Sequence, residues 1–203
     1  VVAEGYIKEA RQKIAATLKV DPKELIITSG GTESNNMALI GTALAAKRKG
    51  NHIITTAVEH PSVKATASFL EEQGFRITFL SVDSRGQISL EDLKEALTPD
   101  TILVSIMYVN NEIGTIQPVE EAAKLVHATV PGAVFHVDAI QAYGKVMIRP
   151  KQQGIDLLSV SSHKFHGPKG AGFLYCSSKV NLHPIIFGGG RSEERRVGKE
   201  CRS

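Results

Sequence analysis

Short apolar runs alternate with amphipathic segments along most of the chain. Runs bounded by Gly, Pro or polar residues are typical of strands, and they occur at 25–28, 52–56, 75–80, 101–107, 133–137, 155–160 and 171–176. Apolar residues at a spacing of three or four indicate helices, and they occur within 7–18, 37–44, 63–70, 90–97 and 119–126. This alternation predicts an α/β fold: a mostly parallel central sheet with helices on both faces.

Composition narrows the class of protein. The chain has 203 residues, of which 42% are hydrophobic and 22% charged, so one α/β domain can bury a sizeable core. The net charge of +3 and the absence of Trp give no support to nucleic-acid binding. No apolar run reaches the length of a membrane span. Two cysteines without paired spacing fit a reducing compartment, and we expect a cytoplasmic protein.

The composition changes near the end of the chain. Residues 1–190 are expected to form one large domain, incomplete at both ends because the chain starts at Val1 and not at Met. After Gly188-Gly189-Gly190, residues 191–203 lose all helical or strand periodicity. We expect that tail to be disordered, and foreign or frameshifted in origin.

Polar and glycine residues follow several of the predicted strands. They are Gly30 to Thr32, His60, Asn111, Asp138 and the pair His163-Lys164. The carboxyl ends of parallel strands meet at one edge of a sheet, where ligands of such folds bind. We therefore expect these residues to lie close together.

The types of these residues suggest a chemistry. A helix that opens after Gly30-Gly31 offers free N–H groups to an anion. Lys164 at the mouth of a strand is a candidate for a desolvated amine that forms a Schiff base. Asp138 could keep a pyridine nitrogen protonated, so the set describes a site for pyridoxal 5′-phosphate (PLP). The alternative is that Lys164 is a solvated turn residue and the glycines only cap a helix.

Five motifs resemble those of the cysteine desulfurases, which are class V, fold-type-I PLP enzymes. They agree with that family in order and spacing over residues 1–190. The motifs are Thr28-Ser29-Gly30-Gly31-Thr32-Glu33-Ser34-Asn35-Asn36, Glu59-His60, Val109-Asn110-Asn111-Glu112-Ile113-Gly114, His136-Val137-Asp138-Ala139-Ile140-Gln141 and Ser161-Ser162-His163-Lys164.

The resemblance implies a role for each matching residue. Lys164 would hold PLP, Asp138 would pair with its ring nitrogen and His60 would stack on the ring; these three form the catalytic set. The other implied cofactor-binding residues are Gln141 at the ring hydroxyl, Asn111 beside the ring and the substrate carboxylate, and Gly31, Thr32, Ser161 and His163 at the phosphate. No residue is expected to bind a metal.

The resemblance also implies an activity. L-Cysteine would be converted to L-alanine, and the sulfur would pass to an enzyme persulfide for iron–sulfur cluster assembly or thiolation. The implied partners are a sulfur-acceptor protein and a second copy in a homodimer. The domain that carries the catalytic cysteine is missing. Cys176 reads as a core residue at the far end of a strand and Cys201 falls in the tail, so this chain alone is expected to be inactive.

Two alternatives stay open. A selenocysteine lyase, or another class V lyase or aminotransferase, would share the same residues over this length. A non-enzymatic metal-binding domain could use His60, His163 and His166, although no carboxylate or thiolate completes a recognisable spacing. A P-loop nucleotide binder has no support, because its G-x-x-x-x-G-K-[ST] motif does not occur.

Overall fold

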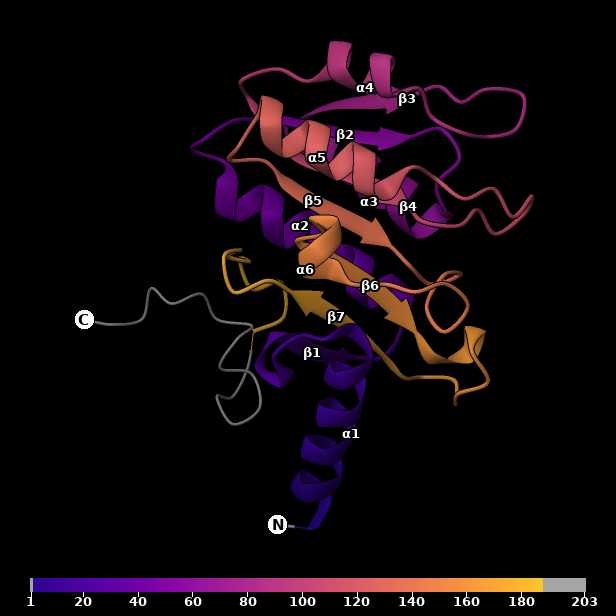
Figure 1. Ribbon diagram of the computed structural model, residues 1–203. Coiled ribbons are helices and arrows are strands. Elements are labelled where there is room, and N and C mark those ends of the chain that lie inside the picture. The colour runs from indigo at the N-terminus through magenta and orange to yellow at the C-terminus, as the bar shows by residue number, and fades with distance from the viewer. Residues whose placement is uncertain (1, 188–203) are drawn as a thin grey trace.

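The computed structural model describes residues 2–187. In that part of the chain the central element is a seven-stranded sheet with the order β1-β7-β6-β5-β4-β2-β3 (Figure 1). The strands are β1 (Leu25–Thr28), β2 (His52–Thr56), β3 (Arg76–Leu80), β4 (Thr101–Met107), β5 (Val134–Asp138), β6 (Leu157–Ser161) and β7 (Gly172–Cys176). The helices are α1 (Val2–Leu18), α2 (Gly31–Ala46), α3 (Pro61–Glu72), α4 (Leu90–Ala96), α5 (Val119–Thr129) and α6 (Pro150–Gln153), with 3-10 turns η1 (Pro22–Glu24) and η2 (Ser162–Lys164).

Most neighbouring strands of the sheet run parallel. The neighbours from β3 through β2, β4 and β5 to β6 are all parallel, and β7 is antiparallel to both β6 and β1. In Figure 1 the arrows of β5 and β6 accordingly point one way and that of β7 the other. Because β7 is antiparallel to both of its neighbours, β1 runs in the same direction as β6. The carboxyl end of β1 therefore lies at the same edge of the sheet as those of the parallel strands.

Helices cover both faces of the sheet, as the sequence predicted. One hydrophobic cluster joins α2 and α3 to the sheet through residues such as Leu39, Leu70 and Ile53. A second cluster joins α1, α4 and α5 to the opposite face through residues such as Val126 and Phe135. Such fully covered strands explain why the apolar runs are nearly continuous.

A close backbone approach brings the start of α2 to the sheet. Gly30 has a φ of 150°, which favours glycine. A Cβ on Gly172, the first residue of β7, would lie 2.6 Å from the Val160 carbonyl oxygen and 2.7 Å from the Gly30 Cα. Only glycine fits at Gly172, and its absent side chain lets the turn before α2 lie directly against β6 and β7.

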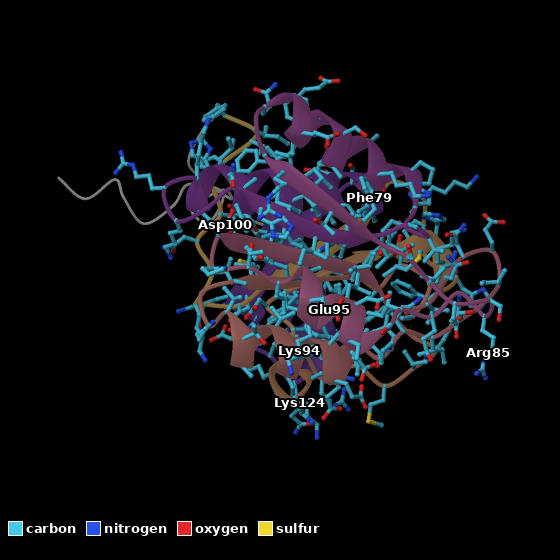
Figure 2. All side chains as sticks on the ribbon, turned by 90° about the horizontal axis from the view of Figure 1, so that it is seen from above. Phe79, Arg85, Lys94, Glu95, Asp100 and Lys124 are labelled. Atoms are coloured by element: carbon cyan, nitrogen blue, oxygen red, sulfur yellow. The ribbon has the colours of Figure 1, made fainter. Side chains whose placement is uncertain are left out.

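The outer surface of the molecule is charged beside the edge strand β3. The Phe79 side chain on β3 is 43% exposed. Lys94 and Glu95 are exposed on α4, which packs beside β3, and Lys124 is exposed on the neighbouring α5; all three are labelled in Figure 2. Charges near an edge strand disfavour its pairing with other chains. Within residues 2–187, no helix has the length and apolar character that crossing a membrane would require.

Two histidines are buried inside the sheet as uncharged hydrogen-bonding residues. The His136 ring lies between Ser105 of β4 and Ser159 of β6, with 2.8 Å from each ring nitrogen to a hydroxyl. Burial lowers the pKa of His136 to about 3. Burial, with a smaller effect of Arg76, lowers the pKa of His52 to about 4. Both imidazoles are therefore neutral in the folded protein at physiological pH.

The predicted strands and long helices are all present. The strand ends lie within two residues of the predicted ones, whereas α1, α2 and α5 extend beyond the apolar positions that predicted them. The short helix α6 was not predicted, nor was the antiparallel direction of β7. The tail expected at 191–203 lies outside the described residues, and its origin stays a prediction.

The buried histidines predict that acid destabilises this fold. The unfolded chain takes up protons on these imidazoles as the pH falls below about 6.5, whereas the folded chain does not, so stability is lost below that pH. His136→Gln should lower the free energy of unfolding by about 1–3 kcal/mol at pH 7.5, because buried hydrogen bonds are lost. It should also reduce the dependence of that free energy on pH by up to about 1.4 kcal/mol per pH unit between roughly pH 4 and 6.

Urea unfolding across this pH range measures both effects. His183→Gln is the control, because His183 is exposed to water in the folded chain. An unchanged pH dependence in His136→Gln would contradict the assignment.

Candidate functional site

The carboxyl ends of the central strands meet around Asp138. In the parallel register, Asp138 at the end of β5 lies opposite Met107 of β4 and Ser159 of β6. Ser161 ends β6 two residues further on, and the Asn110-Asn111 turn follows β4. The strand ends thus gather at one edge of the sheet, as the sequence predicted.

Asp138 is an acidic residue in the interior, with 4% of its surface exposed. Its Oδ1 accepts the backbone N–H of Ile140 at 3.0 Å, and its Oδ2 accepts the Asn35 side-chain N–H at 2.9 Å. Burial is the main effect and raises the pKa of this carboxyl, while the two hydrogen bonds and, last, the nearby His60 act in the opposite direction. Each oxygen therefore receives a donor that favours the ionised form.

A chain of hydrogen bonds joins Asp138 to His60. The Asn35 amide nitrogen donates both to Asp138 and to the Ser62 hydroxyl, the latter at 2.9 Å. The Ser62 hydroxyl lies 2.8 Å from His60 Nδ1, which also accepts the Ser62 backbone N–H at 3.1 Å. Because Nδ1 accepts that bond, the ring proton belongs on Nε2. His60 is the N-cap of α3, and its exposed ring is held in one orientation.

The start of α2 lies against the ends of β5 and β6. Gly30 offers no side chain to cap the helix, so its first N–H groups have no side-chain partner there. A Cβ on Gly31 would lie 2.1 Å from the Ile140 Cδ1 and 3.6 Å from the Ser161 Cβ. The Ser161 hydroxyl in turn lies 2.8 Å from His163 Nδ1. Helix N–H groups, a hydroxyl and an imidazole thus form one donor set suited to an anion.

Lys164 ends the short turn η2, directly after His163. The sequence suggested a desolvated lysine, but in the structure this side chain is exposed. The reason is that η2 leaves the sheet at its open edge, where no described segment covers it. The next residue, Phe165, anchors the turn by packing edge-on against Tyr143, with ring centroids 4.9 Å apart.

Three other predicted site residues lie at this edge without a described contact to the rest of the set. Asn111 is exposed and donates to the Glu112 carboxylate at 2.6 Å. The Gln141 Oε1 is 3.3 Å from Lys145 Nζ. Thr32 is exposed in the first turn of α2, and its backbone carbonyl accepts the Asn36 amide. Their position agrees with the prediction, and their roles stay predictions.

Sequence reasoning gave no role to two buried residues of the site, although both fall in the quoted motifs. Asn35 connects Asp138 to Ser62, and its spacing of four from Gly31 on a helix was the available signal. Glu59 precedes His60 and is 3% exposed. Burial and the nearby Asp138 raise the pKa of Glu59 to about 8.

The donor set fits PLP better than it fits a metal. Asp138 provides a buried anion for a protonated ring nitrogen, and the α2 start with Ser161 provides hydrogen-bond donors for a phosphate. The amine of Lys164 is exposed at the same edge. Among residues 2–187, no group of three or more His, Cys, Asp or Glu side chains could hold a metal ion.

Cys176 lies at the opposite edge of the sheet. It pairs with Leu157 at the start of β6, whereas Gly172 at the other end of β7 pairs with Ser161. Four residue steps along a strand put about 13 Å between the two ends. Its position at the far end of a strand is as predicted, but its side chain is half-buried at the margin of the core, not inside it.

Comparison with known proteins places the chain in a family. The model of the family described as Aminotransferase class-V matches residues 3–202. The cysteine desulfurase IscS of Dictyoglomus turgidum is 50% identical over 194 residues, which is 96% of this chain and 49% of that protein. A solved NifS-like protein superposes with a TM-score of 0.92 at 41% identity, over 98% of this chain and 55% of that one.

A second solved structure, SspA in complex with cysteine, has a TM-score of 0.90 at 40% identity and covers 98% of this chain and 57% of that one. The chain spans about half the length of the curated relatives it matches. The fold is that of the large domain of these proteins. The chain belongs to the class V aminotransferase family, among the cysteine desulfurase-like members.

Proposed function

We propose that this chain is the PLP-binding part of a cysteine desulfurase. The observation that carries the proposal is the buried Asp138 carboxylate, hydrogen-bonded on both oxygens at the same sheet edge as the free start of α2. An interior anion next to an anion-binding helix end suits a ligand that is positive at one end and negative at the other. PLP has that charge pattern, with a ring nitrogen that can be protonated and a phosphate.

Asp138 would hold a proton on the ring nitrogen of PLP. An ion pair shielded from water is stronger than one at the surface, provided that its hydrogen bonds are satisfied. When bound, PLP supplies an electron sink for the carbanion that forms at the substrate Cα. His60 would cover the ring, because the Ser62 contacts fix the direction of its imidazole.

The phosphate would lie at the start of α2. The N–H groups there, the Ser161 hydroxyl, His163 and Thr32 would donate to it. Gly31 and Gly30 permit a ligand to approach the backbone because they lack side chains. Gln141 would bind the ring hydroxyl, and Asn111 would lie beside the ring and the substrate carboxylate.

Lys164 would hold PLP covalently and move protons. Its exposed position on η2 leaves the amine accessible to the aldehyde. With the substrate bound, the Lys164 Nζ would take a proton from the substrate Cα and return one to the product. Proton transfer of this kind by a positioned amine contributes roughly 10²–10⁴-fold to a rate.

The proposed substrate of the whole protein is L-cysteine, and the products are L-alanine and an enzyme persulfide. Relatives named as cysteine desulfurases and a relative solved with cysteine support this substrate. A sulfur-acceptor protein would take the persulfide sulfur, and a second copy of the protein would complete a homodimer. Selenocysteine is the alternative substrate, because none of the roles proposed for these residues distinguishes a side-chain sulfur from a selenium.

The first prediction concerns the attachment point of PLP. The chain should turn yellow with PLP, and borohydride reduction followed by peptide mapping should place the pyridoxyl group on Lys164. Lys164→Ala should abolish the labelling. Lys169→Ala, a matched change of another exposed lysine five residues on, should leave it intact. Labelling that maps to Lys169 in the parent chain would refute the assignment.

The second prediction separates function from stability at Asp138. Burial raises the pKa of Asp138, so the ionised carboxylate costs folding free energy at neutral pH. Asp138→Asn should thus be as stable to urea as the parent or more stable, yet bind PLP at least about tenfold more weakly because the ion pair is lost.

Fluorescence titration with PLP at pH 7.5 measures the affinity. Asp156→Asn is the control, because Asp156 contacts His127 and Phe135 at the opposite edge of the sheet and should leave PLP binding unchanged. PLP affinity within twofold of the parent in Asp138→Asn would contradict the pairing.

The third prediction concerns the sulfur-transfer step. A thiolate must approach the substrate sulfur to about 3–3.5 Å, and Cys176 is fixed at the far edge of the sheet. The PLP-loaded chain incubated with L-cysteine and a reductant should release sulfide no faster than free PLP does. Cys176→Ala should not change that rate. Rapid sulfide release that disappears in Cys176→Ala would show that this residue reaches the site.

A further inference from the structure

Glu59 is a buried acid among the candidate site residues that the proposed function does not use. Its Oε1 accepts the Thr56 hydroxyl at 2.8 Å and the Met107 backbone N–H at 2.9 Å. Its Oε2 is buried and has no hydrogen-bond partner among the described residues. A carboxylate with one bare buried oxygen is costly, whereas a neutral acid carrying its proton there is far less so.

Glu59 connects the segments that carry three site residues. It precedes His60 in the turn after β2. Through Met107 it contacts the residue of β4 that pairs with Asp138 in β5. A second hydrogen bond joins the same turn to the end of β4: the side-chain amide of Asn110, the residue before Asn111, donates to the Val58 carbonyl at 3.0 Å. Glu59 thus lies at the junction of the His60, Asn111 and Asp138 segments.

Two buried carboxyls share this interior, and their hydrogen bonds differ. Asp138 has a donor on each oxygen, whereas Glu59 has both of its donors on one oxygen. Two interacting carboxyls in a low-dielectric interior do not both ionise, and the better solvated one keeps the charge. The hydrogen bonds assign the negative charge to Asp138 and the proton to Glu59 Oε2.

The charged groups around Glu59 agree with this assignment. Asp138 raises the pKa of Glu59 and Lys64 of α3 lowers it, but burial is the largest effect, and the result is a pKa of about 8. Lys64 is exposed to solvent, so water and salt weaken its lowering effect on the pKa of Glu59. Below that pH the folded chain therefore holds a proton on Glu59.

We propose that Glu59 is a neutral carboxylic acid that positions the His60 turn against β4 and leaves Asp138 as the anion of the site. As a positioning residue it acts through its two accepted hydrogen bonds and not through charge. A second anion beside Asp138 would raise the energy of both carboxylates and favour protonation of Asp138, which would remove the partner of the ring nitrogen. The protonation state of Glu59 does not depend on PLP. The benefit to PLP binding rests on the proposed function.

The test compares the pH dependence of unfolding in three forms of this chain without PLP: the parent, Glu59→Gln and Glu71→Gln. Gln keeps the acceptor oxygen of Glu59 and cannot ionise. Glu71 lies on α3 and is exposed, and Glu71→Gln is the same substitution at a carboxylate in water, so it is the matched control. Urea denaturation followed by circular dichroism gives the unfolding equilibrium constant of each form at several pH values.

The sign of the expected effect follows from proton binding. Between roughly pH 5.5 and 7.5 the folded parent holds one proton on Glu59 that the unfolded chain has released, so the contribution of Glu59 to stability falls as the pH rises. This effect is opposite in sign to that of His52 and His136, which is the same in all three forms. The ratio of the parent's unfolding constant to that of Glu59→Gln should therefore rise by about tenfold per pH unit. Glu71→Gln should follow the parent. Equal slopes in the parent and Glu59→Gln, or failure of Glu59→Gln to fold when Glu71→Gln folds, would overturn the proposal.

PLP titration tests the positioning role. Glu59→Gln should bind PLP within about threefold of the parent at pH 7, because the hydrogen bonds to Thr56 and Met107 remain. Glu59→Ala should bind at least about tenfold more weakly, because two buried donors lose their acceptor and the His60 turn is freed. Equal affinities in Glu59→Ala and the parent would refute positioning. Failure of the parent to bind PLP would count against the proposed function alone, because the unfolding slopes are measured without cofactor.

Discussion

The cost of keeping the Asp138 carboxylate ionised inside the protein governs the arrangement of side chains at the carboxyl ends of the parallel strands. Asp138 loses most of its hydration on folding, and hydrogen bonds from the Ile140 N–H and the Asn35 amide replace only part of it. Asn35 also donates to Ser62, so the same interaction fixes the start of α3 relative to α2. The charge therefore orders the surrounding side chains as well as offering a partner to a cationic ligand.

Much of the fold could be predicted from the sequence, because its determinants are local. The runs Ile102–Ile106 and Leu25–Thr28 are apolar on both faces, as strands covered by helices must be. Pro61 begins α3 and the Ser89 side chain caps α4, so the starts of these two helices could also be predicted from the sequence. The site edge followed from the same reasoning, since parallel strands deliver their following residues to one side.

Other features depend on contacts between distant segments and could not be predicted in that way. Glu59 and Asn35 look like ordinary polar residues in the sequence, and their burial depends on Met107 and Asp138, which lie 48 and 103 residues further along the chain. The direction of β7 depends on which neighbours it pairs with. The exposure of Lys164 depends on what covers the η2 turn, and local sequence does not contain that information.

Under the proposed function, cofactor and substrate binding need rigid groups, whereas sulfur transfer needs a mobile one. Strong hydrogen bonds from rigid elements hold Asp138, Ser161 and His60, as is required of groups that must be fixed before a cofactor or substrate binds. A thiol that receives sulfur has the opposite requirement, because it must reach the substrate and then carry the persulfide to an acceptor. Cys176 is held by strand pairing about 13 Å from this edge and meets neither demand. Under the proposed function, Cys176 is therefore not the thiol that accepts the sulfur.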